Sequence, residues 1–264
     1  GAEPQRSPRK RISTALRMGN TEPGLQGYSA WIAARYSASS ATFNPRTAQP
    51  EDDHAVKGGG TGRMRHGVAP EEMAALIAAL GSARDRKHLA EMLGEALSTY
   101  TLQDLQHLRG IIEHEFRDLP APYRRKLYPH AIEQVFGAYH DLMLHHRRIR
   151  SERWEGPLSA LYPDFCRMLQ DLTLSEGGNR LRRYDLLYYL LAAFTMFVRE
   201  LPGHPVGTPF PGGFRVEARN GEYYCPVREK EDDVETSICP FCPAKQAELS
   251  PGKPSKVTAG RTGS

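Results

Sequence analysis

The stretch LLYYLLAAFTMFV at residues 186–198 constrains the fold more than any other part of the sequence. It is apolar at almost every position, so a helix built from it has no polar face to turn toward water and is buried on all sides. The run is about thirteen residues long, whereas a helix that crosses a membrane needs roughly 20. We therefore predict that residues 180–201 form the central helix of a bundle, capped by Asn179, and we expect no membrane span.

The segments that precede this run carry helical patterns and supply the helices that surround it. They comprise residues 69–82, 85–100, 102–119, 128–150 and 157–172. Thr101 and Asp104 have the spacing of a capping box, which predicts the start of the third segment. The prolines of LPAPY at 119–123 are expected to end that helix, because proline lacks a backbone donor, and Pro163 is expected to bend the last one. Residues 67–201 are thus predicted to form a helical domain.

The pattern changes after this domain. The loop PGHPVGTPFPGGF at 202–214 contains four prolines and four glycines, so it cannot be helical. Two strand-like runs then flank Asn220 and Gly221. An Asn-Gly pair in that position predicts a β-hairpin, because both central residues of a type I′ turn need a positive φ angle. The sequence therefore predicts a mostly α fold, a helical bundle with a small C-terminal β-hairpin and a cysteine metal knuckle within residues 202–248.

Three of the chain's four cysteines lie close together in this C-terminal part, and they are the reason to expect a metal there. Thirteen residues separate Cys225 from Cys239, and two separate Cys239 from Cys242. A Cys-x-x-Cys turn brings two thiolates within reach of one ion, and the residue after the hairpin can add a third. A structural zinc ion takes four ligands in a tetrahedron. The sequence therefore predicts a metal site made by these three cysteines and a fourth ligand.

The fourth ligand and the kind of metal stay open at this level. His204 lies in the Pro/Gly loop just before the hairpin, and Cys166 lies on the predicted fifth helix; either could complete the site. Zinc is the first choice of cofactor, and an iron–sulfur cluster is the alternative, because three cysteines with one further ligand suit both. A thioredoxin-like redox pair is disfavoured, since no βαβ unit precedes the Cys-x-x-Cys motif.

Both ends of the chain differ in composition from the part between them. Residues 1–66 are rich in Ser, Gly, Pro, Ala and Arg, and hold ten Lys or Arg against five Asp or Glu. We expect a disordered basic leader there and a disordered tail over 249–264. Contact with nucleic acid is expected only through the leader, where SPRKR at 7–11 is a dense basic cluster. No apolar signal-peptide core follows the basic start, so a reducing cytoplasm is the expected location.

A charged segment follows Cys225 directly. Arg228, Glu229 and Lys230 could form the rim of a pocket beside the metal, or they could belong to a solvated loop together with the acidic run EDD at 231–233. His204 and Glu229 are the residues that we would assign to proton transfer if the site were catalytic.

The C-terminal motifs resemble those of an uncharacterised archaeal family found mainly in methanogens. The resemblance is carried by PGHPVGTPFPGGFRV, YYCPVREK and CPFCPA, and covers about residues 70–248. It implies a cytoplasmic, largely helical protein from an anaerobic methanogen, and it brings no activity with it. Beyond the candidate metal ligands, no set of acid, base and nucleophile is apparent. We therefore expect a metal-binding protein that acts as a binding or assembly factor with a protein partner, the alternative being a metal-dependent or redox enzyme.

Overall fold

The computed structural model describes residues 69–147, 154–175, 181–231 and 234–248. The predicted leader (1–66), the predicted tail (249–264) and the predicted cap Asn179 lie outside these ranges. The helices are α2 (Pro70–Gly81), α3 (Arg86–Ser98), α4 (Leu102–Glu115), α5 (Ala121–Ile132), α6 (Ala138–His146), α7 (Tyr162–Leu174) and α8 (Arg183–Ala193). The strands are β1 (Glu217–Arg219), β2 (Glu222–Cys225) and β3 (Lys245–Gln246).

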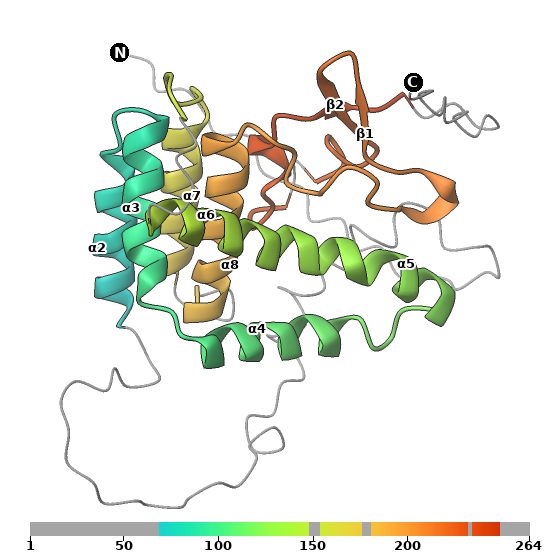
Figure 1. Ribbon diagram of the computed structural model, residues 1–264, viewed down its shortest axis with the longest axis horizontal. Coiled ribbons are helices and arrows are strands. Elements are labelled where there is room, and N and C mark those ends of the chain that lie inside the picture. Colours follow the sequence, from blue (N-terminus) through green and yellow to red (C-terminus); the bar gives the residue numbers. More distant parts are fainter. Residues whose placement is uncertain (1–68, 148–153, 176–180, 232–233, 249–264) are drawn as a thin grey trace, which may run out of the picture.

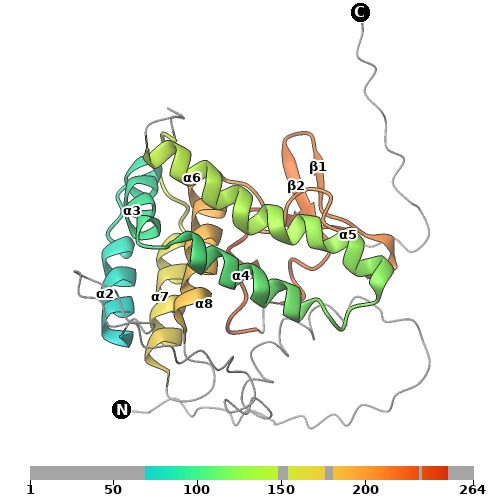
Figure 2. The same ribbon diagram turned by 60° about the horizontal axis from the view of Figure 1, so that its bottom comes forward.

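Helix α8 lies in the middle of the helical part, as its apolar sequence requires. It continues into a π-helical turn, η3 (Phe194–Val198), and almost every side chain of the two is buried. Helices α2, α3, α7 and α8 lie side by side, and α4 and the long rod of α5 and α6 cross them (Figures 1 and 2). Residues 183–198 thus form the buried helix that the sequence predicts, within one continuous apolar core.

The start of α4 confirms the predicted capping box. The Thr101 hydroxyl accepts a hydrogen bond from the Asp104 backbone N–H, and the Asp104 carboxylate accepts one from the Thr101 N–H. Asp104 also binds the Arg183 guanidinium at 3.3 Å, at the start of α8. Residues identified from local sequence therefore also tie two distant helices together.

The starts of two helices differ from the prediction by five residues or more, and proline lies in the first turn of both. The fourth helix begins at Ala121 rather than near residue 128, because Pro120 is its N-cap and Pro122 occupies its first turn; proline is tolerated there since those N–H groups have no helical partner. It runs through a π-turn, η2 (Glu133–Gly137), into α6. Pro163 likewise lies in the first turn of α7, so it starts that helix instead of bending it.

The C-terminal lobe, residues 202–248, contains the predicted hairpin and one strand more. Strands β1 and β2 pair antiparallel across Asn220 and Gly221, whose φ angles are 52° and 80°. These angles are those of the turn that the Asn-Gly pair predicts. The third strand, β3, pairs parallel with β2, so that Cys225 lies opposite Gln246. The sequence patterns did not indicate this strand of two residues.

The lobe packs on the helices and shares their core. The Tyr189 hydroxyl of α8 donates to the Thr236 carbonyl at 2.8 Å, and the rings of Phe165 and Phe241 meet edge to face at 5.5 Å. The structure is therefore mostly helical with a small C-terminal sheet. Within the described ranges, none of the helices has the length and apolar character needed to cross a membrane.

Candidate metal centre

The lobe places Cys225 at the end of β2, between its two neighbouring strands. Its carbonyl accepts a hydrogen bond from the Ala247 N–H at 3.0 Å, just beyond β3. The parallel pairing of β2 with β3 thereby fixes the backbone of Cys225 from the side opposite the hairpin. Its side chain points into the protein, with 3% of the residue exposed.

Cys239 and Cys242 are held by a tight turn, η5 (Cys239–Phe241). The Cys242 N–H donates to the Cys239 carbonyl at 3.1 Å, which closes the turn. The Cys239 N–H donates to the Ser237 hydroxyl at 3.1 Å, and the Gly203 N–H donates to the Cys242 sulfur at 3.3 Å. The Pro/Gly loop therefore supplies a backbone donor to a thiol of the Cys-x-x-Cys motif.

The three cysteines form one buried electrostatic cluster. Cys239 and Cys242 are 4% and 8% exposed. Burial, helped by the neighbouring Cys242 and Glu231, raises the pKa of the Cys225 thiol to about 12. Burial also raises the pKa of Cys239, where Glu231, Cys225 and Cys242 add to the effect. Cys225 and Cys239 thus each have another thiol near enough to disfavour their ionisation, burial raises the pKa of Cys242 as well, and at neutral pH all three are held protonated unless a cation is near.

Glu231 lies beside this cluster, although one interpretation of the sequence assigns it to a solvated acidic loop. The residue is 0% exposed. Its carboxylate accepts a hydrogen bond from the Ser237 hydroxyl at 3.0 Å and lies 3.9 Å from the Cys239 sulfur. The solvated-loop interpretation is therefore wrong for Glu231. No signal in the sequence separates this acid from the charged residues around it, because the run has no regular period that would mark one position as buried.

The structure places the two predicted fourth ligands differently. His204 is 6% exposed, adjoins the Gly203 amide that contacts Cys242, and packs edge to face on Phe210 at 5.6 Å. Burial lowers the pKa of His204 to about 4, so the ring is neutral at pH 7. Cys166 instead lies in the interface of α7 with α2, against Gly81 and beside Tyr162. His204 therefore borders the cluster, whereas Cys166 is buried among the helices.

The charged residues that follow Cys225 also divide into two kinds. Glu229 and Lys230 are exposed, so the predicted rim is solvated there. The Arg228 guanidinium donates to the carbonyls of Cys242 and Pro240, at 3.3 and 3.0 Å. This places a positive charge over the Cys-x-x-Cys turn, where it lowers the pKa of Cys225 and Cys242 against the effect of burial.

The cluster does not have the geometry of a complete metal-binding site. Within the part of the chain that the structure describes, no set of three or more His, Cys, Asp or Glu side chains is arranged so that it could hold a metal ion as it stands. The predicted metal knuckle is therefore not shown by the described residues, which contain a group of buried thiols and a carboxylate in its place. These groups would have to close on an ion to become its ligands.

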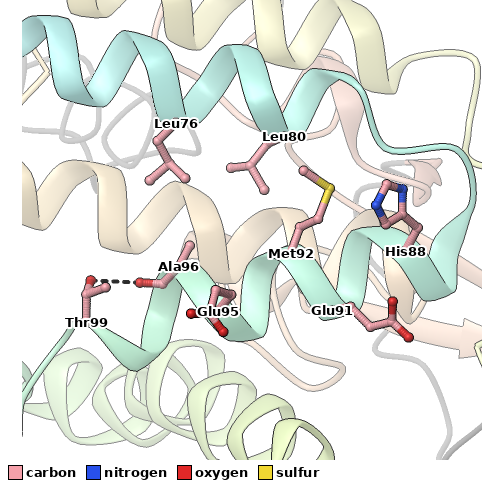
Figure 3. A pocket seen from close by; sticks show the side chains of 8 residues that line it. All are labelled: Leu76, Leu80, His88, Glu91, Met92, Glu95, Ala96 and Thr99. Atoms are coloured by element: carbon pink, nitrogen blue, oxygen red, sulfur yellow. Dashed lines mark hydrogen bonds between the residues drawn. The ribbon is translucent and has the colours of Figure 1, made fainter.

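A separate hollow lies between α2 and α3, about 560 Å³ in volume. Figure 3 shows the aliphatic side chains of Leu76, Leu80 and Met92 facing one another across it, with His88 and Glu91 toward one end. None of the three lobe cysteines lines this hollow. It is therefore distinct from the cysteine cluster.

The fold and the cluster define a class: a mostly helical protein with a small C-terminal lobe that holds three buried cysteines and a buried carboxylate. The chain belongs to the family described as an uncharacterised protein conserved in archaea, DUF2115, whose sequence model matches residues 85–247. The match runs through α3 to β3 and includes the whole cluster. It confirms the resemblance to an archaeal, methanogen-associated family.

Several relatives come from methanogens. A UPF0305 protein of Methanothermobacter thermautotrophicus is 29% identical over 158 residues, which cover 58% of this chain and 92% of the relative. A shorter alignment with a UPF0305 protein of the same archaeon is 45% identical over 60 residues and covers 23% of this chain and 39% of the relative. A UPF0305 protein of Methanopyrus kandleri is 33% identical over 129 residues, 48% of this chain and 86% of the relative. No solved structure is significantly similar to the chain.

Proposed function

We propose that the C-terminal lobe binds a metal through Cys225, Cys239 and Cys242, with zinc as the first choice and an iron–sulfur cluster as the alternative. The single observation that carries this proposal is the burial of three mutually interacting thiols in one lobe. The lobe has strands of only three, four and two residues. A structure with so little regular pairing gains much of its stability when a metal joins its segments.

Metal binding also accounts for the electrostatics of the cluster. Buried thiols with raised pKa values are poor nucleophiles, because the thiolate is the reactive form. A divalent cation reverses this situation, since coordination deprotonates a thiol outright. The Gly203 amide and the Arg228 guanidinium then stabilise the thiolate of Cys242. The environment is therefore unfavourable for a free reactive cysteine and favourable for a coordinated one.

We further propose that the protein works as a metal-stabilised binding or assembly factor in the cytoplasm of methanogens, through a protein partner. Burial of the three thiols supports this choice over an enzyme, because a structural site is closed, whereas a catalytic site keeps a position open for water or substrate. The proton-transfer pair considered from the sequence gains no support, since Glu229 is exposed and His204 is buried.

The test is a metal and sulfide analysis of the full chain, purified without oxygen from a methanogen. We expect one zinc per chain in the wild-type protein and in the matched control Cys166→Ser, and a loss of the metal in Cys242→Ser. If the protein contains iron and sulfide instead, the metal site is supported and its cofactor is an iron–sulfur cluster. Wild-type protein that carries no metal and takes up none when zinc is added would contradict the proposal.

The partner is tested in the same purification. We expect a partner protein to be retained by the wild-type chain and by Cys166→Ser at equal yield, and to be lost with Cys242→Ser, because the lobe surface depends on the metal. A partner that is retained equally by all three proteins would show that the lobe is not the binding element. A chain that purifies alone, with a metal open to exogenous ligands, would favour the enzyme.

A further inference from the structure

Glu231 has an unusual position for an acid in a run of acidic residues. It is fully buried, and one hydroxyl connects it to the Cys-x-x-Cys turn. The Ser237 Oγ donates to Glu231 Oε2 at 3.0 Å and accepts from the Cys239 N–H at 3.1 Å. Ser237 therefore fixes the carboxylate against the first cysteine of the turn. A carboxylate held so firmly beside a thiol has a defined role in the lobe.

The carboxylate also faces the cysteine on the other side of the cluster. It lies within electrostatic range of Cys225 at the end of β2 as well as of Cys239 in the turn. Cys242 acts on the same two thiols. Glu231 is thus a neighbour of two of the three cysteines, one from β2 and one from the Cys-x-x-Cys turn. Burying several acidic groups together is costly unless a cation accompanies them.

The distance between Glu231 and Cys239 suits a shared ion. A zinc ion binds thiolate sulfur at about 2.3 Å and carboxylate oxygen at about 2.0 Å, so two such ligands in a tetrahedron lie about 3.5 Å apart. The Glu231 Oε2 and Cys239 Sγ atoms lie 3.9 Å apart. A shift of a few tenths of an ångström would therefore bring the pair to ligand spacing.

We infer that Glu231 is the fourth ligand of the metal in the lobe, giving a site of three cysteine sulfurs and one carboxylate oxygen. This inference rests on the proposed metal-binding function. It favours Glu231 over the two candidates drawn from the sequence, because the Glu231 carboxylate lies 3.9 Å from the Cys239 sulfur, whereas Cys166 lies among the helices. The cluster contact next to His204 is made by the backbone N–H of Gly203. A carboxylate ligand also favours zinc over an iron–sulfur cluster, whose usual ligands are cysteines.

Cobalt(II) is the probe that separates these ligands, because it replaces zinc and absorbs light. Thiolate-to-cobalt charge transfer in the near ultraviolet reports the sulfurs, and the visible bands report the whole coordination sphere. The full chain would be titrated with cobalt alone, without oxygen, as wild type and as Glu231→Gln. The matched control is Glu229→Gln, which removes the same charge two residues away from an exposed side chain.

For Glu231→Gln we expect cobalt affinity to fall by about 100-fold or more, a larger loss than outer-shell changes produce. The visible bands should move while the thiolate bands persist at saturating metal. Glu229→Gln should behave as wild type, and Glu231→Asp should recover part of the affinity. Far-ultraviolet circular dichroism checks that the helices of each variant are intact.

Wild-type affinity and unchanged visible bands in Glu231→Gln would overturn the assignment of Glu231 and leave the metal site standing. A shift of the visible bands in His204→Gln or Cys166→Ser alone would likewise transfer the role to that residue. If the wild-type chain binds neither cobalt nor zinc, the proposed function fails, and the assignment of a ligand fails with it.

Discussion

The helical part and the C-terminal lobe of this molecule are stabilised in different ways. The helices bury large apolar side chains around α8, where Leu187, Tyr189, Phe194 and Phe197 are almost entirely inaccessible to water. The lobe has a sheet of short strands, and besides apolar side chains such as Val216 and Val227 its interior contains thiols, a carboxylate and the His204 ring. Apolar burial alone is enough to explain the first part. The second part buries groups that normally need a compensating partner.

Because the two parts are stabilised differently, they should respond to different perturbations. The largest effect is expected from the loss of a metal ligand. Cys239→Ser removes a sulfur from the proposed site and with it on the order of 10 kcal/mol of metal-binding free energy. We expect the variant to lose its metal and the ordered structure of the lobe, with the helices largely retained. Circular dichroism and metal analysis of the same sample check this. Normal folding of the lobe in Cys239→Ser would contradict the proposed difference between the lobe and the helices.

The matching perturbation of the helices is Phe197→Ala. Phe197 is 1% exposed and meets the rings of Tyr162 and Phe165, each at 5.1 Å. Deleting the ring should lower the free energy of unfolding by about 3–5 kcal/mol. Urea unfolding of the metal-loaded protein measures the loss. We expect no change in metal affinity for the folded variant, and a variant that loses the metal while its helices stay intact would contradict the division.

Acid should weaken the lobe through His204. Its folded-state pKa of about 4 lies below the ordinary value of 6.5, so the unfolded chain binds a proton that the folded chain rejects. Stability is therefore highest above pH 6.5 and falls as the pH drops toward 4. Between pH 7 and pH 5 the His204 contribution should fall by roughly 2 kcal/mol. The free energy of unfolding of wild type and of His204→Gln, measured at both pH values, isolates the His204 contribution. Equal pH dependence in the two proteins would contradict this prediction.

The smallest predicted effect concerns the contact between the two parts. Tyr189→Phe removes the hydroxyl that donates to the buried Thr236 carbonyl at 2.8 Å. Leaving that carbonyl without its donor should cost about 1–2 kcal/mol. Hydrogen exchange should show the loss around Thr236 before it shows in the helices. Tyr100→Phe is the matched control, because its hydroxyl donates to a carbonyl of the helical part, that of Arg183; it should leave exchange in the lobe unchanged.

Much of the fold can be predicted from local rules that the sequence displays. Thr101 with Asp104 and Asn220 with Gly221 predict a helix start and a hairpin turn, because each pair satisfies its own backbone. The apolar run at 186–198 predicts the buried helix for an equally local reason. The start of α5 could not be predicted in this way, because a proline ends a helix in one context and begins one in another. The role of Pro120 and Pro122 is decided by the packing of the helix that they begin.

The candidate site could be predicted only in part, and the limit is again physical. The spacing of Cys225, Cys239 and Cys242 indicates a common site, because a tight turn and a strand end can converge. The burial of Glu231 depends on Ser237 and on contacts across the lobe, which no periodic pattern encodes. Strand β3 was missed for the same reason, since two residues are too few to carry a pattern of alternation.

The central claim is that the lobe depends on a metal and the helices do not. Hydrogen exchange of the full chain, measured by mass spectrometry with zinc bound and after its removal by a chelator, tests this claim most directly. We predict that backbone amides of residues 203–231 and 234–248 lose protection when the metal is removed, while those of α3, α7 and α8 keep it. Equal protection of the lobe with and without metal would contradict the account.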